Sequence, residues 1–166
     1  MNTKKLCIMG LLIALTCVAT MCIHIPIPAT SGYINVGDSI ILITAVIFGN
    51  PYAVIAGGIG SALADLLLGY TNYVPVTLIV KGLEGLLVAV IAGKSVNFFT
   101  VRKMAAAILG VAWMVLGYFI FETFIYGMAA AAESVVSNCM QAGGSFVIFI
   151  VLGFALHKAK IANYIK

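Results

Sequence analysis

The sequence predicts an all-α integral membrane protein: a six-transmembrane-helix bundle whose N and C termini are cytoplasmic. Hydrophobic residues make up 63% of the 166 residues and charged residues only 8%. The mean hydropathy of +1.18 lies far outside the range of soluble domains. The apolar runs are about as long as a bilayer-spanning helix. Residues 1–166 therefore form a single membrane-embedded domain, with no room for a soluble catalytic module.

Six helices are expected, at about residues 5–25, 38–49, 52–68, 75–93, 104–127 and 137–156. The first ends before Pro26, because proline removes a backbone donor. No small-residue cleavage site follows it, so we interpret it as a retained helix and not a signal peptide. The second begins beside Asp38, a helix-start residue. It rises only about 18 Å, so we expect residues 26–37 to fold down and complete the outer surface.

The basic residues set the orientation, because they gather on the cytoplasmic side of membrane proteins. Eight of them flank the expected helices on one side: Lys4, Lys5, Lys94, Arg102, Lys103, Lys158, Lys160 and Lys166. The acids then fall in the outer half: Asp38, Asp65, Glu84, Glu122 and Glu133. The net charge of +4 thus reflects topology, and no nucleic-acid partner is expected.

Lys81 and Glu84 are the only charged residues in the fourth apolar stretch. A charge at the centre of a bilayer helix costs about 2.5 to 3.5 kcal/mol on insertion scales, so such groups usually face a protein interior or a wet cavity. Their spacing of three places them on one helix face. We therefore expect them to pair with each other in a polar site.

Polar residues of four helices reach one depth. With a rise of 1.5 Å per residue, Asp65, Lys81, Glu122 and Gln141 lie roughly 5 to 9 Å below the outer boundary, and Glu84 lies at about 13 Å. Asn138 shares a face with Gln141, and Tyr118 lies one turn below Glu122. Single polar residues often only hold helices together, but a set at one depth favours a small-molecule pocket that opens outward.

Aromatic residues gather near the same level and suit a planar heteroaromatic ligand. Tyr33 lies in the first outer loop, and Tyr70, Asn72 and Tyr73 lie in the loop of residues 69–73. Tyr and Trp also form ordinary interfacial belts, and Trp113, near mid-membrane, is the weakest of these candidates. We expect Tyr33, Tyr70 and Tyr73 to form or close a lid.

Recognisable catalytic and metal-binding patterns are absent from the sequence. It contains no phosphate-binding glycine loop and no dinucleotide fingerprint, and His24 stands alone. The cysteines lie in apolar segments without ligand spacing: Cys7, Cys17, Cys22 and Cys139. We expect no enzyme activity, no metal and no cofactor. Small residues mark two surfaces: Gly57 and its neighbours suit internal packing, whereas Gly10 and Ala14 would form a docking surface if they point outward.

Three sequence runs resemble the substrate-binding S components of energy-coupling factor (ECF) vitamin transporters, and specifically the riboflavin-type branch with its hydroxymethylpyrimidine and pyridoxine carriers. They are residues 32–38 (GYINVGD), 56–66 (AGGIGSALADL) and 75–85 (PVTLIVKGLEG). The last is the most specific. Gly117-Tyr118 to Glu122 and Asn138-Cys139-Met140-Gln141 resemble the later helices of the family, so the resemblance covers nearly the whole chain.

The resemblance implies a vitamin carrier in the prokaryotic plasma membrane, driven by a transmembrane T component and two cytoplasmic ATPase subunits that use the ATP. Such proteins commonly carry an AxxxA signature on helix 1 for T-component docking. Here Gly10, Ala14 and Val18 stand in its place, so the line of small residues is altered. Pocket residues vary between carriers, so the resemblance does not name the ligand.

The expected function is therefore high-affinity binding of a small vitamin or vitamin precursor for ECF-type uptake. The expected binding residues are Lys81, Glu84, Asp65, Glu122, Asn138, Gln141, Tyr33, Tyr70, Tyr73, Tyr118 and Asn72. Pyridoxine-like or hydroxymethylpyrimidine-like ligands rank ahead of riboflavin, because the outer loops are short for a tricyclic ring. The alternative is an autonomous secondary transporter or channel with an ion relay. The one-sided depth of the charges argues against a relay.

Overall fold

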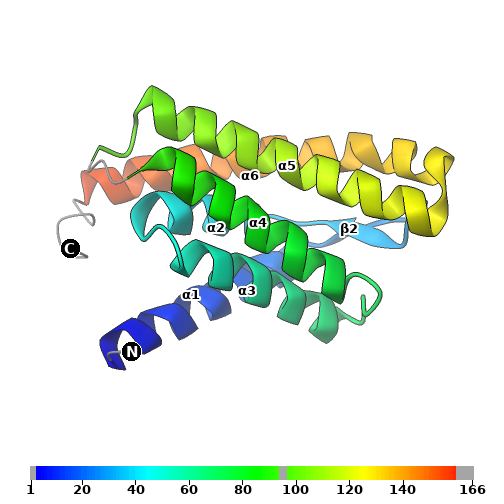
Figure 1. The fold of residues 1–166 in the computed structure, drawn as a ribbon, viewed down its shortest axis with the longest axis horizontal. Helices are drawn as coiled ribbons and strands as arrows, with labels where there is room; N and C mark the ends of the chain where they lie inside the picture. Colours follow the sequence, from blue (N-terminus) through cyan, green and yellow to red (C-terminus); the bar gives the residue numbers. More distant parts are fainter. Residues whose placement is uncertain (1–2, 94–96, 160–166) are drawn as a thin grey trace.

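The computed structural model describes residues 3–93 and 97–159. Within these ranges the elements are α1 (Thr3–Cys22), β1 (Ile25–Ile27), β2 (Gly32–Ile34), α2 (Gly37–Ile47), α3 (Tyr52–Leu68), α4 (Val74–Ala92), α5 (Val101–Tyr126) and α6 (Met128–Lys158). The helices run broadly along the long axis of the molecule (Figure 1). The two strands form an antiparallel hairpin, which lies toward the end opposite the chain termini (Figure 1).

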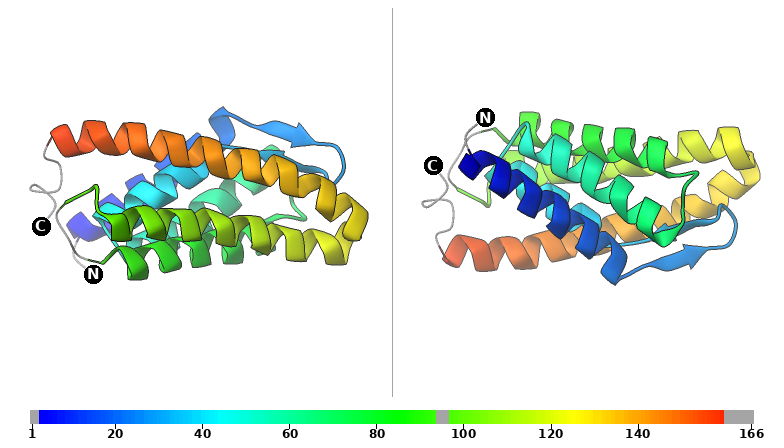
Figure 2. Two further views of the ribbon diagram at one scale, coloured as in Figure 1. Left: turned by 90° about the horizontal axis from the view of Figure 1, so that it is seen from above. Right: turned by 90° about the horizontal axis from the view of Figure 1, so that it is seen from below.

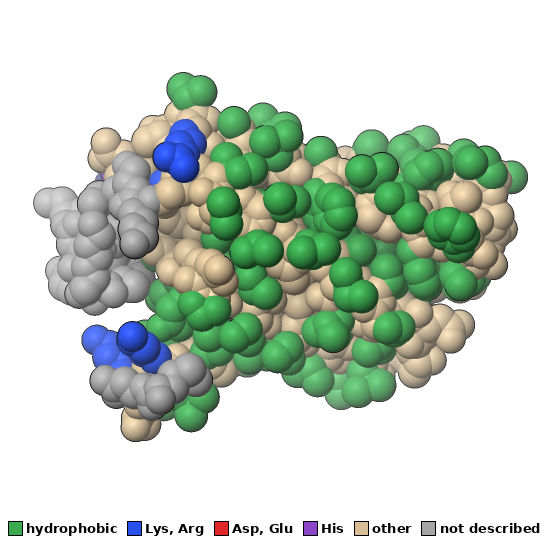
Figure 3. Space-filling view, viewed as in Figure 1, with side chains coloured by type: hydrophobic (Ala, Val, Ile, Leu, Met, Phe, Trp, Pro, Cys, Tyr) green, Lys and Arg blue, Asp and Glu red, His purple; other side chains and the backbone are tan. Residues whose placement is uncertain are grey.

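Four of the described helices are long and apolar enough to cross a membrane, namely α1, α4, α5 and α6, whereas α2 and α3 are apolar but shorter. Hydrophobic side chains are spread over most of the face seen in Figure 3. Phe124, for example, is 83% exposed. So many exposed large apolar side chains suit contact with lipid. The predicted helical membrane fold is confirmed at this level, and the number of spans stays a prediction.

The short helix α2 forms the centre of the bundle. It packs against all five other helices, which Figure 2 shows from two sides. Ile41, Leu42 and Thr44 are fully buried in it. A helix that is apolar on all faces belongs in a core, which accounts for an element too short to span a bilayer squarely.

Helices α3 and α4 approach each other closely through glycines, as the sequence indicated. A Cβ on Gly57 would lie only 2.8 Å from the backbone carbonyl oxygen of Lys81, and a Cβ on Gly85 would collide with the carbonyl group of Ala53. Small residues permit such backbone approach in lipid, where packing supplies much of the association energy.

Three predicted boundaries need correction. Helix α1 ends at Cys22, not at 25, because the segment before Pro26 already pairs as strand β1. Residues 26–37 were expected to be a loop that folds down over the outer surface, but they contain most of the hairpin. Helix α6 begins at Met128, not at 137. The alanines at 129–132 are strong helix formers, and the polar residues after them lie on a helix face, so they do not form a loop.

The described basic residues Lys4, Lys5, Arg102, Lys103 and Lys158 belong to the beginning of α1, the beginning of α5 and the end of α6. These three helix ends lie together, at the left in Figure 1. The Lys and Arg side chains visible in Figure 3 are confined to that end of the molecule. The other basic residues in the orientation argument, Lys94, Lys160 and Lys166, lie outside the described residues. The sidedness of the termini stays a prediction.

Candidate functional site

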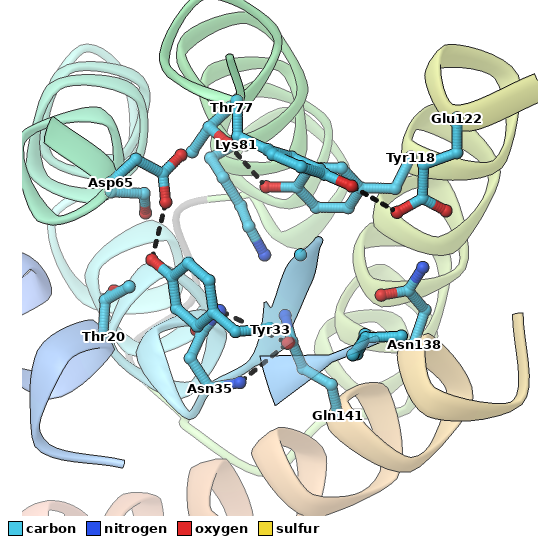
Figure 4. Close-up of a pocket in the computed structure, with 14 residues that line it drawn as sticks. Thr20, Tyr33, Asn35, Asp65, Thr77, Lys81, Tyr118, Glu122, Asn138 and Gln141 are labelled. Atoms are coloured by element: carbon cyan, nitrogen blue, oxygen red, sulfur yellow. Dashed lines mark hydrogen bonds between the residues drawn. The ribbon is translucent and has the colours of Figure 1, made fainter. Parts of the chain in front are cut away.

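A polar cavity lies beneath the hairpin (Figure 4). Its volume is about 20 Å³, which is room for about one water molecule. Side chains from five helices, the hairpin and the adjoining loops line it. They are Thr20, Ile27, Gly32, Tyr33, Asn35, Ser61, Asp65, Tyr73, Thr77, Lys81, Tyr118, Glu122, Asn138 and Gln141.

Lys81 supplies the positive charge of the cavity. Its ammonium donates to the carboxylate of Asp38, and it lies 3.6 Å from the carboxylate of Glu84. The ammonium also stands 5.5 Å from the centre of the Tyr118 ring, within cation–π range. The predicted pair is therefore part of a triad in which Asp38, on α2, is the closer partner of Lys81.

Glu84 does not line the cavity. It is fully buried, and neither of its carboxylate oxygens has a hydrogen-bond partner in the described part of the chain. Its neighbour is Lys81, one turn nearer the hairpin. Its position beneath Lys81 fits a structural role more closely than direct contact with a ligand.

Gln141 joins the hairpin to the centre of the bundle. Its amide oxygen accepts hydrogen bonds from the backbone N–H of Asn35, at 2.8 Å, and from the Asn35 side chain, at 3.3 Å. Its amide nitrogen donates to the second carboxylate oxygen of Asp38, at 2.7 Å. All three residues are buried. Because the Asp38 carboxylate holds both Lys81 and Gln141, a continuous series of polar contacts connects the hairpin with Lys81 at the floor of the cavity.

The α3 wall meets the hairpin through Tyr33 and Asp65. The Tyr33 hydroxyl donates to Asp65 Oδ1 at 2.6 Å, a short bond typical of a charged acceptor. Burial raises the pKa of the Tyr33 phenol, and the neighbouring Asp65 carboxylate raises it further. Tyr33 therefore keeps its proton and remains a donor. The Tyr33 ring also packs on Tyr70, with 4.5 Å between ring centres.

The opposite wall centres on Glu122. The hydroxyl of Tyr73 lies 3.1 Å from one carboxylate oxygen and 2.8 Å from the backbone carbonyl of Thr30. Ser134 donates to the other oxygen of Glu122, and Asn138 donates to Ser134 at 3.4 Å. Burial also raises the pKa of Tyr73, so its hydroxyl stays a donor. Both oxygens of Glu122 are thus engaged by hydroxyl groups.

The structure brings eight of the eleven predicted binding residues to the cavity: Lys81, Asp65, Glu122, Asn138, Gln141, Tyr33, Tyr73 and Tyr118. Three lie elsewhere. Glu84 lies beneath the floor, Tyr70 supports Tyr33 from outside, and Asn72 is exposed in its loop. Trp113 donates to the Val80 carbonyl at 3.1 Å and serves packing between α5 and α4.

Sequence reasoning missed Thr20, Asn35, Ser61 and Thr77 in the lining and the central role of Asp38. Thr77 precedes Lys81 by four residues, and Ser61 precedes Asp65 by four, so helical spacing from the predicted charges would have found both. Nothing local marks Asn35, because its role depends on how the hairpin folds back. Asp38 was predicted as a helix-start residue and as one of the acids of the outer half, but not as a partner of Lys81, since the central position of α2 cannot be read locally.

The small-residue line on α1 faces outward. Gly10, Ala14 and Val18 are exposed, and Val18 is 55% exposed. A Cβ on Gly10 would meet no atom within 4 Å. These three residues therefore point away from the bundle, and their role in docking stays a prediction.

An apolar helical bundle that encloses a polar cavity near one end is typical of membrane proteins that bind small polar molecules. The family model described as the ECF-type riboflavin transporter, S component, matches residues 1–158. The chain therefore belongs to the family of ECF-type S components, which are transporter subunits and not enzymes.

Two relatives are similar to the chain over most of its length. The chain is 33% identical over 163 residues to the thiamine precursor transporter HmpT of Lactococcus lactis subsp. cremoris (strain MG1363), covering 98% of this chain and 93% of the relative. It is 39% identical over 141 residues to an uncharacterized protein in a gap 3' region of Pyrococcus woesei, covering 85% of this chain and 93% of that one. Family and relative together support vitamin-related substrate binding for uptake.

Proposed function

We propose that the chain binds a small planar heteroaromatic vitamin precursor, of the hydroxymethylpyrimidine or pyridoxine kind, and delivers it across the prokaryotic plasma membrane. The observation that carries this proposal is the buried cavity with Lys81 at its floor and the Asp65 and Glu122 carboxylates on opposite walls. Such a set of donors and acceptors, with Tyr118 and Tyr73 beside it, offers a polar ring both hydrogen bonds and aromatic contact.

The size of the cavity favours a single ring. Because the cavity has a volume of only about 20 Å³, the lining side chains must move to admit even a pyrimidine. A tricyclic ring with a sugar-alcohol tail would need a far larger rearrangement. Riboflavin is the second candidate, because the matching family model carries that description. The thiamine-precursor assignment of HmpT supports the smaller ligand.

Mass spectrometry of the small molecule that co-purifies with the detergent-solubilised protein tests the ligand. We expect a pyrimidine or pyridine of vitamin-precursor size. Recovery of riboflavin would replace the first candidate by the second. Recovery of no vitamin-like compound, together with no binding in titrations of purified protein, would contradict the proposal.

We further propose that transport needs a T component and two ATPase subunits, with both termini of this chain on the cytoplasmic side. The outward-facing line of Gly10, Ala14 and Val18 offers the T component a surface of small side chains. Uptake of labelled precursor by cells with and without the ATPase subunits tests the coupling. Uptake that persists without them would favour the autonomous transporter.

A further inference from the structure

Two polar atoms on one helix face of the cavity lack hydrogen-bond partners. Among the residues that line the cavity, Ser61 Oγ and Asp65 Oδ2 are buried atoms without a hydrogen bond in the described part of the chain. Ser61 is 1% exposed and Asp65 is 3% exposed. The hydroxyl of Thr77 shares a hydrogen bond of 3.0 Å with Tyr118, in which either group can donate, and it also stands near the Asp65 carboxylate (Figure 4).

Other polar groups of the cavity are already engaged. Gln141 uses its oxygen for Asn35 and its nitrogen for Asp38. Glu122 accepts from Tyr73 and Ser134. A buried polar group without a partner costs about 1 to 3 kcal/mol, and native proteins rarely keep one without a reason. Among the lining residues, the two buried unsatisfied atoms of α3 are therefore candidates for a hydrogen bond with a ligand.

The chemistry of the pair is specific. Ser61 and Asp65 are four residues apart on α3, so they share a helix face. Tyr33 holds Asp65 Oδ1, which fixes the direction of the carboxylate. Oδ2 has no hydrogen bond of ordinary geometry in the described part of the chain, and its polar neighbour is the Thr77 hydroxyl. An ionised carboxylate oxygen only accepts hydrogen bonds, whereas a serine hydroxyl donates or accepts. The Ser61 and Asp65 face of α3 therefore suits a ligand group that donates hydrogen bonds.

We propose that Ser61 and Asp65 form the subsite that recognises an exocyclic amino group on the ligand ring, with Asp65 as the residue that determines specificity. The inference rests on the proposed function and deepens it. An amino group donates to Asp65 Oδ2, whereas an oxo group at the same ring position would place two acceptors against each other. Sites that hydrogen-bond a ligand N–H reject analogues lacking it strongly.

The test compares two probes by calorimetric titration of the purified protein: 4-amino-5-hydroxymethyl-2-methylpyrimidine and its 4-oxo counterpart. We expect the amino compound to bind at least about tenfold more tightly to the unmodified protein. Asp65→Asn keeps an oxygen to accept from Tyr33 and replaces the free acceptor by a donor. The preference should then fall below about threefold or reverse. Ser61→Ala should weaken binding of the amino probe about fivefold or more.

Two matched controls isolate the subsite. Ser145→Ala removes another buried hydroxyl that has no hydrogen-bond partner in the described chain but does not line the cavity. Glu133→Gln makes the same carboxylate-to-amide change at an exposed position. Both should keep the preference of the unmodified protein for the amino probe.

The outcomes separate the two claims. If the unmodified protein binds both probes and Asp65→Asn leaves their affinity ratio unchanged, the subsite is wrong while the proposed function stands. If neither probe binds, a pyrimidine-binding function is wrong and the subsite falls with it. Should Asp65→Asn fail to fold, Ser61→Ala decides alone, and undiminished affinity for the amino probe would overturn the proposal.

Discussion

Asp38 is the residue on which the order of the cavity floor depends. It is fully buried, and it holds the Lys81 ammonium with one oxygen and the Gln141 amide with the other. Buried charges are tolerated only where partners offset the cost of leaving water. The ion pair with Lys81 and the hydrogen bond from the Gln141 side-chain amide therefore depend on the same carboxylate.

We expect Asp38→Asn to destabilise the protein by about 3 to 5 kcal/mol, because it leaves the Lys81 charge without its nearest partner. Thermal unfolding in detergent measures the loss. The double variant Asp38→Asn/Lys81→Met should lose less than the sum of the two single variants, since it removes both charges. Strictly additive losses would show that the two side chains do not interact.

Tyr33→Phe should weaken ligand binding about tenfold, because it removes the hydroxyl bond to Asp65, and bonds to charged groups contribute about 1.5 to 3 kcal/mol. The ring contact with Tyr70 remains. Equilibrium titration with the co-purifying ligand measures the effect. Tyr52→Phe, whose ring packs on Phe48 away from the cavity, is the control. Equal affinities in both variants would exclude a role for this hydroxyl in holding the hairpin closed.

The pKa of Tyr33 predicts how this bond responds to pH. The folded protein raises the pKa of a phenol that titrates at about 10 when unfolded. The stabilisation is therefore fully present below about pH 10 and is lost only as the pH rises beyond that value toward the raised pKa. Thermal stability of Tyr33→Phe relative to the unmodified protein should show a constant difference between about pH 6 and pH 9.

At the scale of elements, the bundle depends on how closely α3 and α4 approach. Gly57→Ala should destabilise the protein by about 1 to 3 kcal/mol, because its Cβ would lie 2.8 Å from a carbonyl oxygen of α4. Gly143→Ala is the control on α6, where a Cβ meets nothing within 4 Å. There alanine should be neutral or stabilising by up to about 1 kcal/mol. Similar unfolding temperatures for the two variants would contradict the tight contact.

The helices themselves followed from the sequence to the extent that their signals are local. Apolar runs and turn residues located all six, and helix depth grouped Asp65, Lys81, Glu122 and Gln141 correctly around one cavity. The hairpin had no such signal. Its strands of three residues each are too short for an alternating pattern, and their pairing depends on contacts that Asn35 and Tyr33 make with distant helices.

Local sequence patterns also could not predict where each helix lies within the bundle. The sequence showed that α2 is short and apolar but not that it is surrounded by the other five helices. Asp38 was therefore not recognised as the partner of Lys81. The polar residues at the beginning of α6 suggested a loop for the same reason. Ser134 donates to Glu122 and accepts from Asn138, and these contacts depend on how α6 packs against α5, which the local sequence does not show.

At the scale of the whole molecule, the exposed α1 line predicts a variant that separates binding from transport. Ala14→Leu places a large side chain on the proposed docking surface, at an exposed residue that does not line the cavity. We expect ligand affinity to stay within about twofold and uptake by the assembled transporter to fall at least about tenfold, because packed interfaces tolerate added bulk poorly. Radiolabelled uptake and titration of the purified chain measure the two effects.

Ala105→Leu is the control, since Ala105 is an exposed small residue on α5 and lies on a different helix from the proposed docking line. Its uptake should match that of the unmodified protein. Equal loss of uptake in both variants would indicate a general effect of surface bulk and not a specific contact of α1.

The central placement of α2 also bears on how such carriers diversify. Asp38 fixes the floor from a helix that contributes no side chain to the lining itself. The wall residues Asp65 on α3 and Glu122 on α5 make no hydrogen bond with Asp38, so substitutions there leave the Asp38–Lys81 ion pair in place. Such a separation allows ligand preference to be changed at a wall while the charged centre of the bundle keeps its geometry, as the different ligands named for the family model and for HmpT would require.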